Sequence, residues 1–239
     1  MNTRPTPARR AVIVDHGLGN LFSVLHACEQ VGLNAEISAD RAKIMASDAL
    51  ILPGVGAFGD AMERLERLDL IAPIRDFASS GKPMMGICLG FQLFFTESHE
   101  FGLNRGLDLI PGSVERLDHP MENDRRLKVP QVGWNTIHTP AGAAATALWA
   151  GTPLEGQSEG AYFYFVHSYI ARPADGSCIL TVTRYGGIDF CSSARRNAVF
   201  GCQFHPERSG PAGLAMYQRL ADSIRPTHPT PGESHGTES

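Results

Sequence analysis

The stretch GICLG, residues 86–90, places a lone cysteine between two glycines at the point where a strand-like run becomes helix-like. Two interpretations of Cys88 are open. Cysteine is a small, often buried residue and glycines mark tight turns, so the pattern alone favours packing. A sharp strand-to-helix bend is also the setting of a nucleophile elbow. Because a free thiol is only slightly ionised near neutral pH, a nucleophilic Cys88 needs a base elsewhere in the chain.

The best-placed base lies in GCQFHPERSG, residues 201–210. The run VFGCQF predicts a strand with His205 at its carboxyl end, and Pro206 ends that strand. Glu207 follows closely enough to orient the imidazole if the chain bends there. The pattern therefore favours a triad of Cys88, His205 and Glu207, with a polar turn after a buried strand as the alternative for H-P-E.

Acyl chemistry through a thiolate also needs N–H donors for an oxyanion. The N–H of Leu89, directly after the cysteine, is one candidate. The PGVGAFG loop, residues 53–59, offers Val55 and Gly56, because its glycines let bare backbone approach closely and tolerate peptide flips. The loop lacks the G-K-[ST] ending of a P-loop and the G-x-G-x-x-G spacing, so phosphate binding is disfavoured.

Alternating elements in the first half predict a doubly wound, mostly parallel sheet flanked by helices, which is an α/β fold. Short apolar runs at 11–15, 34–39, 48–53 and 82–88 are predicted to be strands. Between and after them, 21–32, 41–46, 60–81 and 89–98 read as helices. Beyond residue 105, β-branched and aromatic residues predict added antiparallel strands, and 211–224 predicts a closing helix.

The carboxyl ends of parallel strands meet at one edge of an open sheet, and ligands bind there. Cys88, the glycine-rich loop and His205 all fall at this edge, which raises the case for the nucleophile. Two further histidines, His16 and His167, follow strand-like runs and could line the same edge.

The chain as a whole has 239 residues and a formal net charge of −4, which gives no electrostatic reason to bind nucleic acid or an anionic membrane. Its apolar runs fall short of a membrane span, and MNTRPTPARR lacks the apolar core of a secretory signal. Five scattered cysteines without a C-x-x-C pair argue against a disulfide framework or zinc site and favour a reducing, cytoplasmic setting. We expect a flexible stretch over 1–10, one domain over 11–224 and a disordered tail over 225–239, with no metal or cofactor.

GICLG, HPE and PGVG together resemble the class I (triad) glutamine amidotransferases. DHGLGN (15–20), LPGVGAFGDAM (52–62), VGWN (132–135) and YFVHSY (164–169) extend the resemblance to one branch of that family, over about residues 11–224. The resemblance implies hydrolysis of glutamine to glutamate and ammonia. In it, Cys88 attacks the side-chain amide, His205 acts first as base and then as acid, and Glu207 orients the imidazole.

Further site residues come from the resemblance alone. It implies that glutamine is held at Gly54, Gly56, Gln92, Ser168 and Tyr169. It also implies a heterodimer with a cyclase subunit of histidine biosynthesis, a (β/α)₈ barrel that receives the ammonia through an internal channel. The residues expected toward that partner are Asn20, Trp134, Asn135 and Arg208.

Some positions depart from the pattern of this branch. His16 stands where Tyr is common, Gln131-Val132 where His-Met is common, and Arg208 where Lys is usual. Arginine keeps the charge but changes the hydrogen-bond geometry, so these departures concern the interface and not the triad. The alternatives are a cysteine hydrolase or chaperone-like protein on a similar scaffold, a paralogue that serves another synthase such as one of surface-sugar biosynthesis, and an inactive scaffold subunit.

Overall fold

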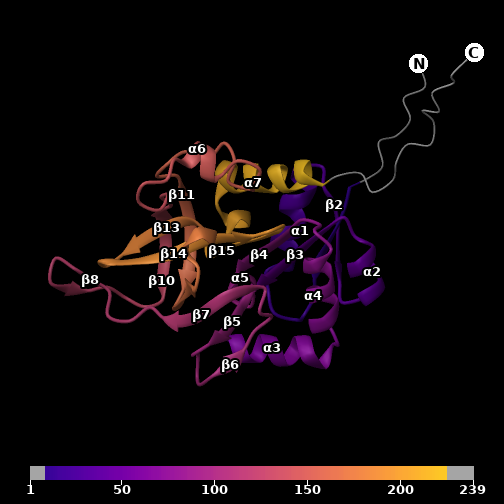
Figure 1. Cartoon of the computed structure of the whole chain (residues 1–239), viewed down its shortest axis with the longest axis horizontal. Helices are drawn as coiled ribbons and strands as arrows, with labels where there is room; N and C mark the ends of the chain where they lie inside the picture. Colours follow the sequence, from indigo (N-terminus) through magenta and orange to yellow (C-terminus); the bar gives the residue numbers. More distant parts are fainter. Residues whose placement is uncertain (1–8, 225–239) are drawn as a thin grey trace, which may run out of the picture.

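A central sheet organises the structure, a computed structural model that describes residues 9–224 (Figure 1). Most of the stretch expected to be flexible (residues 1–8) and the tail (225–239) lie outside the described residues. Of the first ten, Arg10 already belongs to the first strand. No helix within the described range is both long and apolar enough to cross a membrane.

Eleven strands of the described chain form this sheet, and its first part is parallel. The parallel part contains β1 (Arg10–Val14), β2 (Asn34–Ser38), β3 (Ala49–Gly54), β4 (Met84–Cys88) and β15 (Val199–Cys202). The rest contains β5 (Phe95–Ser98), β6 (Asn104–Arg105), β7 (Ile110–Arg116), β12 (Tyr169–Pro173), β13 (Ile179–Tyr185) and β14 (Ile188–Arg196).

The strand order is β2-β1-β3-β4-β15-β14-β12-β7-β5-β6, with β13 paired to β14 off this path. All pairs from β2 to β15 are parallel, as is β5 with β7, and the others are antiparallel. The predicted α/β class with added antiparallel strands is therefore confirmed.

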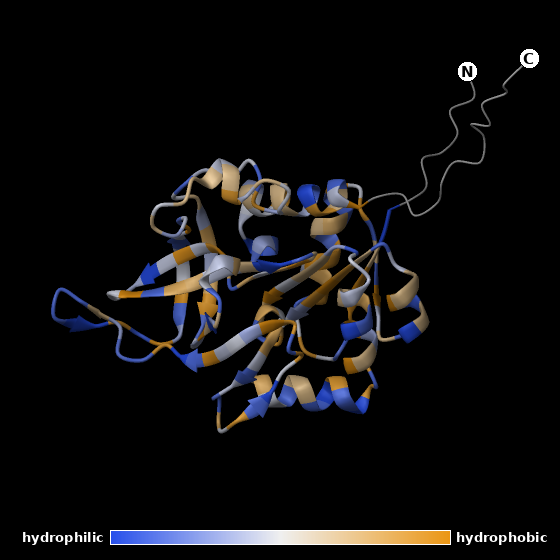
Figure 2. Cartoon of the chain, in the orientation of Figure 1, coloured by the Kyte–Doolittle hydropathy of each residue, from blue (hydrophilic) through white to orange (hydrophobic). Residues whose placement is uncertain are grey.

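Helices cover both faces of the sheet. They are α1 (Leu21–Gln30), α2 (Arg41–Ala46), α3 (Phe58–Arg67), α4 (Ile71–Ser79), α5 (Leu89–Gln92), α6 (Ala145–Leu148), α7 (Gly210–Ser223) and the 3₁₀ turns η1 (Gly176–Cys178) and η2 (Pro206–Arg208). Strand β1 shows the consequence: Ala11 and Ile13 belong to the core beneath α1 and α7, whereas Val12 and Val14 belong to the core beneath α2, α3 and α4. Figure 2 shows the central strands as largely apolar, because they are buried on both faces.

Two predicted helices are wrong in extent. The helix expected over 60–81 is two helices, because Asp69 adopts a left-handed conformation with φ 53° between α3 and α4. This break places Pro73 in the first turn of α4, where its missing N–H costs nothing. The helix expected over 89–98 ends at Gln92, and Phe95 begins strand β5, which pairs with β7. Phe91, Phe94 and Phe95 in this stretch are all fully buried, and they do not form the single apolar face of a longer helix.

Two smaller sheets stand beside the main one. β10 (Gln131–Thr136) pairs with β11 (Tyr162–His167), and β8 (Met121–Glu122) pairs with β9 (Arg125–Arg126). Ser168 separates β11, which belongs to a small sheet, from β12, which belongs to the main sheet.

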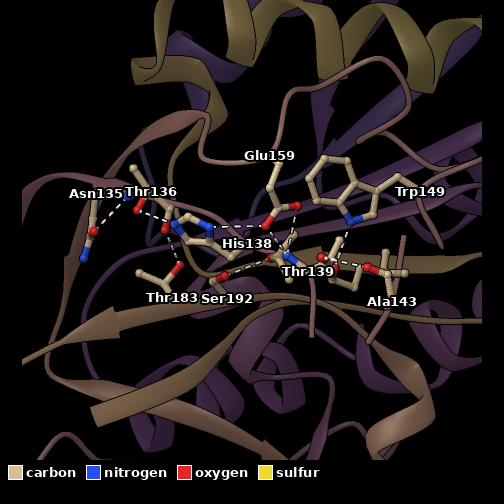
Figure 3. Close-up of polar contacts among 11 residues, drawn as sticks. Asn135, Thr136, His138, Thr139, Ala143, Trp149, Glu159, Thr183 and Ser192 are labelled. Carbon is tan, nitrogen blue, oxygen red and sulfur yellow. Dashed lines mark hydrogen bonds and ion pairs between the residues drawn. The ribbon is translucent and has the colours of Figure 1, made fainter. Parts of the chain in front are cut away.

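Polar contacts fix the long segment that joins β10 to β11 (Figure 3). The His138 ring lies between Thr136 Oγ1 at 2.9 Å and Glu159 Oε1 at 3.2 Å. Trp149 Nε1 donates to the carbonyl of Leu180 at 2.8 Å, which ties the same segment to β13. The His138 bonds hold the segment together, and the Trp149 bond holds it against the main sheet, where Val166 of β11 lies beside Cys88.

Candidate active site

Cys88 sits on a sharp bend between β4 and α5. It is the last residue of β4, paired with Gly54 of β3, and Leu89 begins the helix. Its backbone has φ 55° and ψ −110°, a conformation that side-chain-bearing residues rarely adopt. Strain of this kind persists where the surrounding structure imposes it and clusters at functional sites. The predicted strand-to-helix elbow is present.

The two glycines around the cysteine have packing roles. A Cβ on Gly86 would overlap the Phe94 ring, and a Cβ on Gly90 would overlap the carbonyl oxygen of Leu52. Gly90 therefore lets α5 lie directly on β3. The glycines therefore provide the tight packing, and the cysteine between them carries the unusual backbone of the elbow.

His205 and Glu207 come together directly after β15. His205 Nδ1 donates to Glu207 Oε1 at 2.8 Å, and the two side chains are 5% and 1% exposed. The backbone holds the imidazole in place, since His205 N donates to the Tyr164 carbonyl at 2.9 Å and the Ser209 hydroxyl donates to the His205 carbonyl at 2.7 Å.

The charge state of His205 follows from its neighbours. Burial lowers the pKa of this imidazole, but charge and hydrogen-bond interactions with Cys88 and Glu207 outweigh burial and raise the pKa to about 10. Its Nε2 is buried and makes no hydrogen bond of standard geometry within the described chain. The interaction with Cys88 is thus looser than that with Glu207, and Nε2 remains available for proton exchange.

A buried glutamine that the sequence reasoning missed also reaches the sulfur. Gln203 Nε2 lies 3.6 Å from Cys88 Sγ, and Gln203 Oε1 accepts from Gln92 Nε2 at 2.9 Å. Gln92 Nε2 also donates to the Tyr169 carbonyl at 3.0 Å. The available signal was a single polar residue inside the otherwise apolar run VFGCQF.

A cavity of about 260 Å³ opens beside Cys88. Its lining residues are Val55, Gly56, Cys88, Leu89, Gln92, Glu100, Pro130, Val166, His167, Ser168 and Tyr169. All the residues expected to bind substrate or oxyanion line it, with the exception of Gly54. Gly54 lies behind the cavity, in register with Cys88 and in contact range of Leu89.

Two ionisable side chains line this cavity in addition to the residues expected to bind glutamine. Glu100 was not singled out by the sequence, whereas His167 was expected at this edge of the sheet. Glu100 Oε2 accepts from the backbone N–H of Phe58 at 2.7 Å, and burial raises the pKa of its carboxyl group. His167 donates through Nδ1 to the Tyr169 carbonyl at 3.0 Å, and burial lowers its pKa to about 4. His167 is therefore a neutral imidazole at the cavity wall. His16, by contrast, is bonded to the Pro53 carbonyl at 2.8 Å and supports the loop from behind.

An apolar surface lies on the outer face of the β10–β11 pair. Directly paired residues of antiparallel strands point to the same side, so Val132, Trp134 and Tyr164 share a face with Val166 and Tyr162. Val132, Trp134 and Tyr162 are exposed. The same face includes Val166, which also lines the cavity, so this outer face reaches the site of Cys88.

The residues expected toward a partner are distributed unevenly. The Arg208 guanidinium lies 4.4 Å from the centre of the Tyr164 ring, and Trp134 packs edge-on against that ring. Asn20 is exposed before α1, a helix that contacts η2, where Arg208 lies. Asn135 points to the other face of β10, and its Nδ2 donates to the Arg184 carbonyl at 2.9 Å.

Comparisons with known proteins agree on one family. The family model described as "Glutamine amidotransferase class-I" matches residues 12–221. The chain is 45% identical over 209 residues to the imidazole glycerol phosphate synthase subunit HisH of Rhodopirellula baltica, covering 87% of this chain and 95% of that one. It is 42% identical over 217 residues to the HisH subunit of Moorella thermoacetica, covering 91% and 96%.

Solved structures show the same fold at lower identity. A chain of PurLQS from Thermotoga maritima superposes with a TM-score of 0.68 at 18% identity, covering 91% of this chain and all of that one. A crystal structure of a glutamine amidotransferase superposes with a TM-score of 0.64 at 17% identity, covering 88% and 98%.

Proposed function

Because this chain belongs to the class-I glutamine amidotransferases, and within them to the HisH group, we propose that it is the glutaminase subunit of an imidazole glycerol phosphate synthase. The observation that carries the proposal is the meeting of Cys88, His205 and Glu207 beside a cavity that the expected substrate residues line. Each step of the proposed reaction has a group in place.

In the first step, the Cys88 sulfur attacks the side-chain amide carbon of glutamine. The elbow exposes the sulfur to the cavity, and His205, with its raised pKa, holds the proton that the thiol gives up. That proton passes from Nε2 to the amide nitrogen as the C–N bond breaks. Ammonia leaves and a glutamyl thioester remains on Cys88.

The tetrahedral intermediate carries its negative charge on the former amide oxygen. The proposed donors are the N–H of Leu89 and an N–H of the Val55–Gly56 loop, all of which line the cavity. Gly56 has φ 103°, a conformation open to glycine and strained for other residues, so the loop backbone can be turned toward the oxyanion.

In the second step, water splits the thioester. The neutral form of His205 takes a proton from the water, the hydroxide adds to the acyl carbon, and the sulfur leaves with glutamate as the product. Glu207 keeps Nδ1 of His205 hydrogen-bonded throughout, so Nε2 faces the reacting atoms. The cycle consumes one glutamine and one water and yields glutamate and ammonia.

The cavity supports recognition of a free amino acid. Glutamine carries an ammonium group and a carboxylate on its α-carbon, and Glu100 supplies a negative side chain at the cavity wall. Gln92, Ser168 and Tyr169 provide amide and backbone groups for the remaining polar atoms. A cavity of about 260 Å³ accommodates a molecule of this size.

The ammonia is proposed to pass to a cyclase subunit, a (β/α)₈ barrel, docked on the outer face of the β10–β11 pair. This face is apolar, exposed and continuous with the cavity through Val166. Arg208, stacked on Tyr164, and Asn20 would lie at its margin. We leave the Asn135 side chain out of the proposed surface, because it is bonded on the opposite face.

The test measures glutamate release from glutamine by the purified chain, alone and with a histidine-pathway cyclase and its nucleotide substrate. Cys88→Ala is the catalytic control and Cys178→Ala, a half-buried cysteine outside the cavity lining, is the matched control. We expect strong stimulation by the cyclase that only Cys88→Ala abolishes. No glutamate from the wild type in either condition would overturn the glutaminase. Cysteine-dependent activity that ignores the cyclase would overturn this partner and point to another synthase.

A further inference from the structure

We propose that Gln203 is a positioning residue for the nucleophile: its side-chain amide donates to the Cys88 sulfur and stabilises it as a thiolate, with Gln92 holding that amide in place. The inference deepens the proposed function and rests on it. It gives a role to a fully buried polar side chain that the triad leaves unused.

The direction of the hydrogen bonds is fixed by a backbone group. The Tyr169 carbonyl can only accept, so the Gln92 atom 3.0 Å from it is the Nε2 donor. The same Nε2 carries a second hydrogen, which reaches the acceptor Oε1 of Gln203 at 2.9 Å. The other end of the Gln203 amide is therefore its Nε2, and it points to Cys88 Sγ at 3.6 Å.

The backbone places Gln203 beside the cysteine. Cys202 is in register with Ile87 on the neighbouring parallel strand, so the next residues along the two strands, Gln203 and Cys88, leave the sheet side by side. Gln203 N donates to the Ser192 carbonyl at 2.9 Å, which holds the strand end against β14. Little freedom remains for the side chain to turn away.

An amide donor has a specific value next to a thiolate. Hydrogen bonds to the charged form of a group favour that form. Gln203 supplies such a bond without bringing a proton that the reaction would have to remove, whereas His205 both stabilises and exchanges protons. Gln203 therefore stabilises the Cys88 thiolate by hydrogen bonding, and His205 in addition exchanges the proton.

The Gln92 amide connects this arrangement to the cavity. No donor within the described chain is bonded to Gln92 Oε1, and Gln92 lines the cavity. A donor group of a bound ligand at Oε1 would polarise the amide and strengthen its N–H bond to Gln203, because linked hydrogen bonds reinforce one another. Occupancy of the cavity thereby favours the thiolate.

The experiment follows alkylation of Cys88 by iodoacetamide as a function of pH, without glutamine, with the modified residue located by mass spectrometry. For Gln203→Leu we expect the pH midpoint of the alkylation rate to rise by about one to two units, the value of a hydrogen bond to a charged group. For Gln203→Glu we expect a larger rise, since a carboxylate would face the sulfur. The matched control is Gln157→Leu, which removes an amide bonded to the Ala212 carbonyl at 2.9 Å and should leave the midpoint unchanged.

A second variant keeps the proposal testable if the Gln203 variants do not fold. Gln92→Leu removes the bond that holds the Gln203 amide, and we expect a smaller rise of the midpoint in the same direction. The proposal would be overturned if folded Gln203 variants kept the wild-type midpoint. If the Gln203 variants do not fold, an unchanged midpoint in Gln92→Leu would overturn it. Alkylation needs no glutamine, so it tests the role of Gln203 even if the glutaminase assay fails. A failed glutaminase assay would count against the proposed function and not against this proposal.

Discussion

His205 and Glu207 stand two residues apart, with Nδ1 and Oε1 2.8 Å from each other and both side chains almost completely excluded from solvent. Bulk water has almost no access to this pair. The imidazole therefore depends on Glu207 for its orientation and, together with Cys88, for its raised pKa.

Glu207→Gln should lower kcat by about 10²–10⁴-fold, because a neutral amide neither stabilises the imidazolium nor fixes Nδ1 as the donor. The loss should appear mainly in kcat, since Glu207 does not line the cavity. Steady-state kinetics of glutamate release in the presence of the partner would measure it. A variant with near wild-type kcat and intact thermal unfolding would show that Glu207 is not the orienting acid.

Cys88→Gly should be more stable than Cys88→Ala, although both lack the nucleophile. The backbone at φ 55° and ψ −110° is open to glycine and strained for alanine. Relief of about 1–3 kcal/mol of strain exceeds the roughly 0.5–1 kcal/mol of extra chain entropy that glycine loses on folding. Urea unfolding of the two variants compares them directly, and a less stable glycine variant would mean that the elbow is unstrained.

Gly213→Ala should destabilise the protein and slow glutamate release. A Cβ at this position of α7 would overlap the Pro206 carbonyl, so the turn between His205 and Glu207 would have to move. Overpacking of this kind costs about 1–3 kcal/mol. Gly176→Ala is the matched control, because nothing lies within 4 Å of a Cβ there. Equal effects of the two variants on unfolding and on kcat would contradict the expectation.

His167 should make stability fall at mildly acidic pH. Its pKa of about 4 in the folded protein lies below the ordinary value of 6.5, so the unfolded chain binds more protons between these values. The contribution is complete above pH 6.5 and declines as pH falls through this window, by about 2 kcal/mol between pH 7 and pH 5. The stability difference between wild type and His167→Gln, measured by urea unfolding, should shrink by this amount. His99→Gln, at an exposed position, is the control for the removal of a histidine. If the stability difference between wild type and His167→Gln did not vary with pH, His167 would not be a buried neutral imidazole.

Trp134→Ala should weaken binding to the proposed cyclase partner by about 30-fold or more, the scale of an aromatic hot spot. Alkylation of Cys88 in the isolated chain should be unaffected. Phe101→Ala, at an exposed aromatic residue between β5 and β6, is the matched control and should bind as the wild type does. Calorimetric titration of each variant with the partner would decide, and equal affinities would remove the β10–β11 face from the proposed interface.

Local sequence predicted the parts of the site that depend on strand ends. β1, β3 and β4 are buried on both faces and read as continuous apolar runs, so the positions that follow them were placed correctly. Cys88 and His205 could be assigned to one edge for this reason. The ends of the helices were harder to predict. The turn at Asp69 and the short α5 depend on tertiary packing, which the spacing of apolar residues does not reveal.

Residues set by long-range pairing escaped prediction. Glu100 reaches the cavity through its bond to Phe58, forty-two positions away, and nothing near it in the sequence marks it. The orientation of Asn135 depends on its register with Phe163 of β11, which the sequence does not state. Gln203 had a local signal, because it is a single amide in an otherwise apolar strand. Its hydrogen bond to Gln92 could not be predicted, because it depends on the fold.

The β10–β11 pair has a consequence for how a docked subunit could be sensed. Its outer face carries Trp134 and Tyr164, and its inner face carries His167, with only one layer of backbone between them. A subunit docked on the outer face would therefore be separated from the cavity by this one strand pair, and not by a whole domain. Val132 pairs with Val166, whose carbonyl lies 3.7 Å from Cys88 Sγ, so a fluorophore at Val132 would report on docking at the part of this face that adjoins the reacting sulfur.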